Sequence, residues 1–214
     1  MGTIYISENA YEEVTSYIRS LGHDVAAVRP NAGLSAPVAA HADLAFCRLG
    51  IAPDAPVFRG DTGRLGPVYP DDVRFCAACT GKYIICNARI TDPGLLGAAE
   101  EAGMTLVNVR QGYARCSTLI AGEENIITSD EGICRECVKA GLSALLISPG
   151  GILLPGYEYG FIGGASGRIG GEIIFNGDIS GHRDFSRIKD FISGLGLSMK
   201  WFPGLPLTDI GSIV

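Results

Sequence analysis

A repeated unit runs through this chain and constrains its fold more than any other feature. Each copy has a β-rich run, a polar turn, an amphipathic helix and a second β-rich run. Four copies begin at Thr3, Tyr83, Asn125 and Glu172. In each, a Ser, Asn or Asp ends the first run, where a helix needs a capping side chain. We therefore predict an α/β fold built from similar modules.

A further β-rich run stands in front of three of the copies and joins the next run through a glycine-containing turn, which is typical of a hairpin. These runs read "DVRFCAACTG", "YARCSTLIAGEE" and "YGFIGGASGRIGG". The first copy has no such run before it, but the segment Leu205–Val214 is a candidate strand. Pairing of that segment with the first strand would close a ring and remove open sheet edges.

The stretch from Val38 to Gly66 fits the repeat poorly. "HADLAFCRLG" is predicted to be a strand and "APVFRG" a short second one, and no helix of adequate length follows. We interpret it as a fifth, eroded module. The expected architecture is a single domain, residues 1–214, of five ββαβ modules with approximate bounds 205–214 plus 1–30, 38–66, 70–110, 111–150 and 155–204.

Composition and charge exclude several classes of protein. The chain is 47% apolar, which is typical of a globular protein and not of a disordered one. No apolar run approaches the roughly 18 residues that span a bilayer, and the start lacks the pattern of a signal peptide. The net charge of −6 provides no electrostatic footprint for nucleic acid. We expect a cytoplasmic protein without membrane or nucleic-acid partners.

Seven cysteines in a chain without an export signal indicate reduced thiols, and their odd number excludes a complete set of intramolecular disulfides. Two CxxC pairs, Cys76/Cys79 and Cys134/Cys137, have the spacing of tetrahedral zinc ligands. More than 50 residues separate the pairs, unlike in a compact zinc ribbon. We favour buried small residues over a structural metal site or redox chemistry, and all three alternatives stay open.

Five ββαβ modules around a pseudo-fivefold axis describe the pentein fold, also called the guanidine-group-modifying enzyme fold. The chain resembles this superfamily, and in particular a group of uncharacterised bacterial proteins within it. The residues that carry the resemblance are "HADLAFC", "YPDDVRFCAA", "VRQGYARCS", "IITSDEGI" and "NGDISGHRDFSRI". The resemblance implies a propeller with one eroded blade, and it implies that copies of the chain can associate.

The resemblance also implies a chemistry. Catalytic penteins include arginine deiminases, agmatine deiminases, dimethylargininases and amidinotransferases. They use a cysteine nucleophile that attacks the guanidinium carbon, a histidine that acts as general acid and base, and carboxylates that bind the planar cation through paired hydrogen bonds. This chemistry requires no cofactor.

Short sequence patterns assign these catalytic roles to particular residues. "HAD" matches the H-x-D signature of the superfamily, and on a strand His41 and Asp43 would share one face. "ARCST" resembles the neighbourhood of the family's nucleophile and identifies Cys116. Asp209, in a "TD" pair, and Glu158 are candidates for anchoring the cation. The three patterns lie on predicted leading strands, whose side chains would line the central channel, and no residue of the site is expected to bind a metal.

The chain also departs from the deiminases. Their nucleophile stands near the C-terminus, whereas Cys116 lies in the middle of this chain. "FIGGASG" keeps the glycines of the family's E-G-G-D motif without its acids. Non-catalytic penteins exist, including a ribosome-associated translation factor, so the fold alone does not determine function. Two hypotheses remain: a cysteine-dependent hydrolase or transferase acting on a guanidino or amidino compound, and a non-catalytic binding or assembly protein with Cys116 as a buried structural residue.

Overall fold

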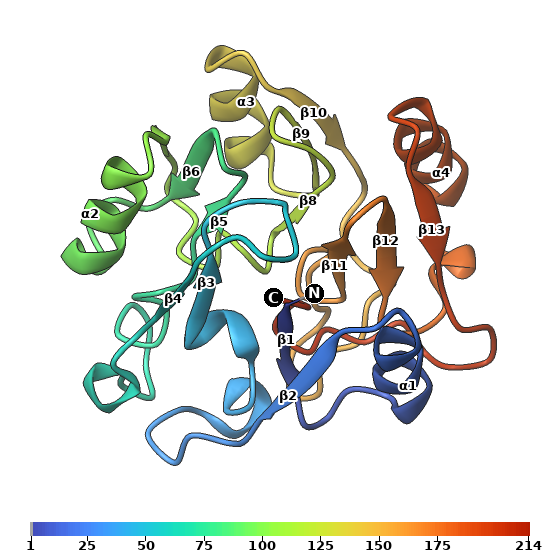
Figure 1. Cartoon of the computed structure of the whole chain (residues 1–214), viewed down its shortest axis with the longest axis horizontal. Coiled ribbons are helices and arrows are strands. Elements are labelled where there is room, and N and C mark those ends of the chain that lie inside the picture. Colours follow the sequence, from blue (N-terminus) through green and yellow to red (C-terminus); the bar gives the residue numbers. More distant parts are fainter. Residues whose placement is uncertain (1) are drawn as a thin grey trace.

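Small β-sheets surround a common centre, with the α-helices at the periphery (Figure 1). The computed structural model describes residues 2–214, and within them the strands form five separate sheets of two or three strands each. Four α-helices accompany these sheets. The predicted mixed α/β class is therefore confirmed. None of the helices between residues 2 and 214 is both long and apolar enough to cross a membrane.

Three of the sheets share one topology. A leading strand pairs antiparallel with a central strand, and after a helix the third strand pairs parallel with the central one. The elements, in chain order, are β5 (Ala78–Cys79), β6 (Tyr83–Cys86), α2 (Pro93–Glu101) and β7 (Thr105–Asn108); β8 (Thr118–Ile120), β9 (Asn125–Thr128), α3 (Glu131–Lys139) and β10 (Ser143–Leu146); and β11 (Ser166–Ile169), β12 (Glu172–Phe175), α4 (Phe185–Gly194) and β13 (Ser198–Lys200). The ββαβ order predicted for these copies is present.

The first copy consists of β1 (Thr3–Ser7), α1 (Glu12–Ser20) and β2 (Asp24–Val28), with β1 and β2 parallel. Val214 exchanges two backbone hydrogen bonds with Tyr5 of β1, at 2.7 and 2.9 Å, so the two chain ends lie side by side (Figure 1). The prediction of a continuous strand over residues 205–214 is wrong. Pro206 and Thr208 form only isolated bridges, to Asp178 and Leu153.

The eroded module is an antiparallel hairpin of β3 (Phe46–Arg48) and β4 (Val57–Arg59), followed by a 3₁₀ turn and no α-helix. The prediction that His41 and Asp43 lie on a strand is wrong, because β3 begins only at Phe46. The chain forms a 3₁₀ turn over Ala42–Leu44, with His41 directly before it. Cys116 likewise lies in a turn just before β8 and not on a strand.

The core explains why the helices sit where they do. Each α-helix buries two side chains four positions apart, which is one helical face. These pairs are Val14/Ile18, Leu95/Ala99, Ile133/Cys137 and Ile188/Ile192. The central strands are buried on both faces, as expected for strands covered by helices outside and by the protein centre inside. Cys137 therefore occupies a core position of α3.

Candidate functional site

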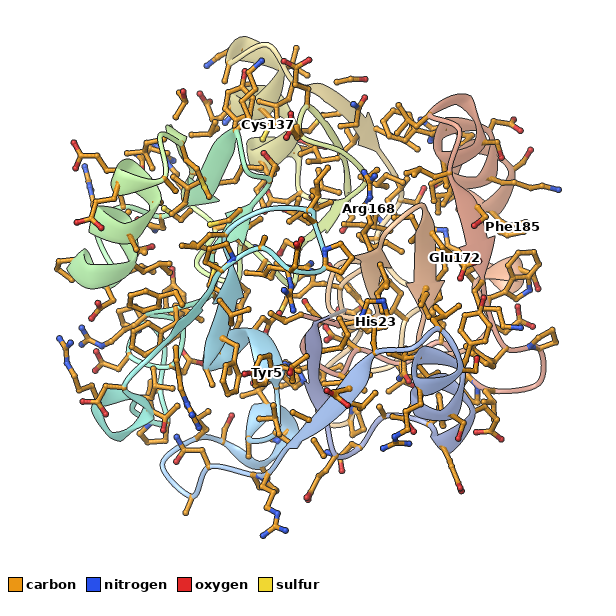
Figure 2. All side chains as sticks on the ribbon, in the orientation of Figure 1. Tyr5, His23, Cys137, Arg168, Glu172 and Phe185 are labelled. Carbon is orange, nitrogen blue, oxygen red and sulfur yellow. The ribbon has the colours of Figure 1, made fainter. Side chains whose placement is uncertain are left out.

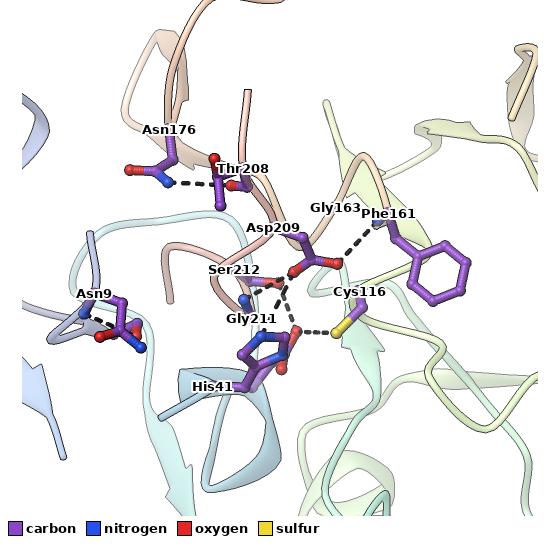
Figure 3. A network of polar contacts seen from close by, with 12 residues as sticks. Asn9, His41, Cys116, Phe161, Gly163, Asn176, Thr208, Asp209, Gly211 and Ser212 are labelled. Carbon is purple, nitrogen blue, oxygen red and sulfur yellow. Dashed lines mark hydrogen bonds and ion pairs between the residues drawn. The ribbon is translucent and has the colours of Figure 1, made fainter. Parts of the chain in front are cut away.

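Three residues from two distant parts of the chain meet in one buried cluster, and Figure 3 labels His41 and Cys116 among them. His41, Asp43 and Cys116 are all buried, and one potential ligand atom of each lies within 4.8 Å of the others. His41 directly precedes the 3₁₀ turn and Asp43 lies within it, whereas Cys116 comes from the turn before β8. The structure thus brings together the three residues predicted to be catalytic, although turns rather than strands carry them.

Asp43 is the hub of the cluster. It has no solvent-exposed surface, and its Oδ2 accepts hydrogen bonds from the Cys116 thiol at 2.9 Å and from the Ser212 hydroxyl at 2.7 Å. Its backbone N–H donates to the carbonyl oxygen of Gly211 at 3.0 Å. Its Oδ1 has no hydrogen-bond partner. A buried carboxylate oxygen without a partner is costly, so this atom is an acceptor whose hydrogen-bonding capacity is unused.

Asp209 supplies a second buried carboxylate. Its oxygens accept backbone hydrogen bonds from Phe161 at 2.9 Å and from Gly211 at 3.0 Å. The Nε2 of His41 lies 4.0 Å from Oδ1 of Asp209, while Nδ1 of His41 has no partner. Burial raises the pKa of Asp209 above its ordinary value, with the charge of His41 opposing the shift.

Glycines make the space that these side chains occupy. A Cβ added to Gly164 would collide with the Asp209 carboxylate, and one added to Gly211 would collide with the His41 side chain. A Cβ on Gly160 would also collide with Asp209. Gly164 of "FIGGASG", together with Gly160 just before the motif, therefore accommodates an acid that comes from a different segment. These two glycines were a signal for the site that the sequence patterns had not assigned.

The Cys116 thiol is held in its protonated form. A hydrogen bond with Cys76, then burial, then the negative charge of Asp43 raise the pKa of Cys116 well above its ordinary value. Because thiolates are the reactive form, Cys116 is a weak nucleophile in the protein alone. A cation placed next to Asp43 and Cys116 would oppose the effect of the carboxylate and lower the thiol pKa.

Glu158 does not belong to this cluster. It is exposed and lines a surface depression of about 410 Å³ together with Asp130 and Phe161. Ser212 and Cys76, in contrast, contact the cluster although sequence patterns did not single them out for it. No pattern around Ser212 signals this role, and the CxxC pattern of Cys76 points to metal binding or redox chemistry and not to this cluster.

A metal ion is chemically compatible with His41, Asp43 and Cys116, because imidazole, carboxylate and thiolate are the ligands that Zn²⁺ takes. These three residues form the one cluster of three or more potential metal ligands found within residues 2–214. The CxxC pairs form no such group. The Cys79 sulfur faces Cys47 at 3.5 Å, whereas Cys137 lies on the buried face of α3 and packs into the core. Nothing in the described part of the chain supports the CxxC zinc alternative.

Comparison with known proteins identifies a family and no characterised relative. A family described as of unknown function (DUF6873) matches residues 55–214, about three quarters of the chain. The matched region includes Cys116 and Asp209 but begins after His41 and Asp43. No curated protein and no solved structure shows a significant match.

Proposed function

We propose that this chain, which belongs to the DUF6873 family of unknown function, is a five-module pentein ring whose central cluster binds and hydrolyses a guanidino or amidino compound. The ring is supported by the three sheets of common topology, the β3–β4 hairpin and the hydrogen bonds between Val214 and Tyr5. Together with β1 and β2 these account for five modules, one of which lacks its helix.

The observation that carries the function is a pair of buried carboxyl groups with little compensating charge around them. Asp43 and Asp209 are both buried. Within residues 2–214, Asp209 pairs only with His41, at 4.0 Å, and Asp43 makes no ion pair. Buried carboxylates are costly unless a cation or hydrogen-bond donors compensate them. A guanidinium or amidinium ion carries a positive charge and several N–H donors in one plane, so it suits the free Oδ1 of Asp43.

The reaction follows from the positions of the three groups. The bound cation lowers the pKa of Cys116, whose proton passes to His41, and the thiolate forms an S–C bond with the electron-poor carbon. His41 returns the proton to the leaving nitrogen, and the C–N bond breaks. Water then adds to the carbon with His41 as base, and the S–C bond breaks. The products are ammonia or an amine, a urea or amide, and the regenerated thiol.

A labelling experiment combined with a turnover assay tests this proposal. The purified chain is incubated with 2-chloroacetamidine, a small amidinium electrophile, and separately with a panel of guanidino compounds in the presence of a chelator, with ammonia as the readout. We expect Cys116 to be alkylated in preference to the more exposed Cys134, and Cys116→Ala and His41→Ala to abolish ammonia release. Cys134→Ala is the matched control. Preferential labelling of Cys134, or turnover that survives Cys116→Ala, overturns the proposal.

A second candidate is a non-catalytic protein whose centre is filled by its own side chains. It is favoured by the hydrogen bonds within the cluster, since Asp43 already accepts from Cys116 and Ser212. In that case Cys116→Ser preserves both the hydrogen bond and the stability of the fold, and no guanidino compound is turned over. The two candidates therefore give opposite results in the labelling and turnover assays.

A further inference from the structure

We propose that a cavity between the β1–β2 sheet and the β3–β4 hairpin binds a small, mainly apolar anion. This cavity is separate from the interior of the central cluster, and only His41 contributes to both. The inference does not depend on the proposed hydrolytic function. It rests on the shape of the cavity, on the charges of its lining and on the support given to one arginine.

The cavity has a volume of about 550 Å³, within the range of small-molecule binding sites. One wall is formed by residues 26–32, which are the end of β2 and the loop after it. The rest of the lining comes mainly from the segments 34–45 and 60–65, with Phe46 of β3 and Arg59 of β4. Alanine, valine, leucine and phenylalanine side chains dominate the lining. Such a surface favours an apolar body over a bare inorganic ion.

The charges in the lining all have one sign. Arg29 and Arg59 line the cavity, whereas no aspartate or glutamate does. Neither arginine makes an ion pair within the described residues 2–214. Two unpaired guanidinium groups on one cavity, in a chain of net charge −6, are complementary to a carboxylate or a phosphate.

Arg59 is positioned by an aromatic stack. Its guanidinium lies 5.4 Å from the centre of the Phe46 ring, which supports it by a cation–π interaction. Phe46 is in turn stacked on Tyr5, with ring centres 4.1 Å apart and an angle of 14° between the planes. Figure 2 shows Tyr5 between the two sheets that form the cavity walls. An arginine held in this way loses less side-chain entropy when it binds an anion.

The edge of β2 adds a second kind of donor. β2 pairs with β1 alone, so its other edge is unpaired within the described residues. The cavity is lined by consecutive residues from Ala26 to Pro30, whose side chains alternate in direction, so it runs along the strand edge. Backbone N–H groups at such an edge are free to bind an anionic oxygen.

Isothermal titration calorimetry on the full chain tests the site with three probes that share a phenyl ring: benzoate, phenyl phosphate and the neutral benzamide, which matches benzoate in size. At about 0.15 M salt, where long-range attraction is screened, we expect saturable binding of at least one anion and about tenfold weaker binding of benzamide. Comparison of benzoate with phenyl phosphate shows which anionic group the site prefers. Loss of one charge-assisted hydrogen bond corresponds to about a tenfold change in Kd.

Variants locate the binding. Arg59→Met and Arg29→Met are each expected to raise the Kd of the preferred anion about tenfold, and Arg59→Lys should retain part of the affinity. Arg19→Met, which removes an exposed arginine of α1 outside the cavity, should leave the Kd unchanged. All three arginine side chains are exposed, and unfolding curves verify that the four variants fold. Equal binding of benzamide, no saturable binding of either anion, or equal effects of Arg19→Met and Arg59→Met overturns the proposal. Because the readout is binding without turnover, a failed hydrolase assay leaves this result unaffected.

Discussion

The Cys116 thiol donates a hydrogen bond to Oδ2 of Asp43 across 2.9 Å, although the two residues are 73 positions apart in the chain. The same oxygen accepts the Ser212 hydroxyl. This arrangement holds the sulfur and its proton against a negative charge in the protein interior. The protonation of Cys116 is therefore coupled to the charge of Asp43, and a substitution of Asp43 should change the pKa of Cys116.

Replacing Asp43 tests this coupling. Asp43→Asn removes the negative charge that helps to raise the pKa of Cys116. The thiolate becomes easier to form, so the pKa of Cys116 should fall, and alkylation of Cys116 by iodoacetamide should reach half its maximal rate at a lower pH. Peptide mapping by mass spectrometry across a pH series measures the rate at this one cysteine.

The control for that series is Glu12→Gln, which removes an exposed acid in the first turn of α1. Glu12→Gln should not change the pH dependence of Cys116 alkylation. An unchanged profile in Asp43→Asn, or an equal shift in the two variants, would show that the Asp43 carboxylate does not control the thiol.

Zinc should compete for the same atoms. Since the potential ligand atoms of His41, Asp43 and Cys116 lie within 4.8 Å of one another, Zn²⁺ is expected to slow alkylation of Cys116. Mg²⁺ prefers oxygen ligands and should not protect the thiol. Cys134, on the partly exposed side of α3, reports on non-specific effects in the same digest.

His41→Gln completes the zinc experiment. It removes the imidazole ligand while keeping a polar side chain of similar reach, so protection by Zn²⁺ should weaken. Equal protection of Cys116 and Cys134, or full protection in His41→Gln, would contradict a metal-binding capacity of these three residues.

Sequence patterns anticipated the modules because each module repeats local rules. The polar residue before a helix, such as Asp130, and the buried pair four positions apart, such as Ile133 and Cys137, depend only on nearby residues. The convergence of Cys116 with His41 and Asp43 was predicted through a family resemblance. The spacing of these residues along the chain does not by itself predict that they meet.

The errors have a physical cause in tertiary contacts. Asp43 lies in a 3₁₀ turn, with His41 just before it, and its N–H donates to the Gly211 carbonyl and not to a neighbouring strand. The segment 205–214 makes isolated bridges because its partners belong to three different parts of the chain. Exposed Glu158 illustrates that an acid close in sequence to a glycine-rich segment need not point inward.

Gly164 should be intolerant of any side chain. Gly164→Ala forces a Cβ into the Asp209 carboxylate, and overpacking of this kind costs about 1–3 kcal/mol of unfolding free energy. Gly171→Ala is the matched control, because a Cβ there meets nothing within 4 Å. Urea unfolding followed by circular dichroism measures both.

The collision can also be relieved from the other side. In a double-mutant cycle, Asp209→Ala should recover part of the stability lost in Gly164→Ala, because it removes the atoms that collide. Strict additivity of the two variants would show that Gly164 does not make room for Asp209.

A pH-dependent contribution to stability is expected at Asp184, which begins α4. Its carboxylate accepts the backbone N–H of Ser148 at 2.6 Å and pairs with Arg187 at 2.9 Å, and these interactions lower the pKa of Asp184 to about 2. The folded state thus favours the charged form. The stabilisation is present above the ordinary aspartate pKa near 4 and is lost as the pH falls from there towards 2.

Asp184→Asn should therefore destabilise the protein by about 1–2 kcal/mol at pH 7, since water screens the half-exposed Arg187 and reduces the effect of the ion pair. The difference from the unchanged protein should shrink as the pH is lowered through 4, because protonation of Asp184 removes the same charge. Urea unfolding at a series of pH values measures this difference. Asp190→Asn, at an exposed position of the same helix, should show no such trend. A difference that stays constant down to pH 2 would mean that Asp184 stabilises the fold through its shape and not through its charge.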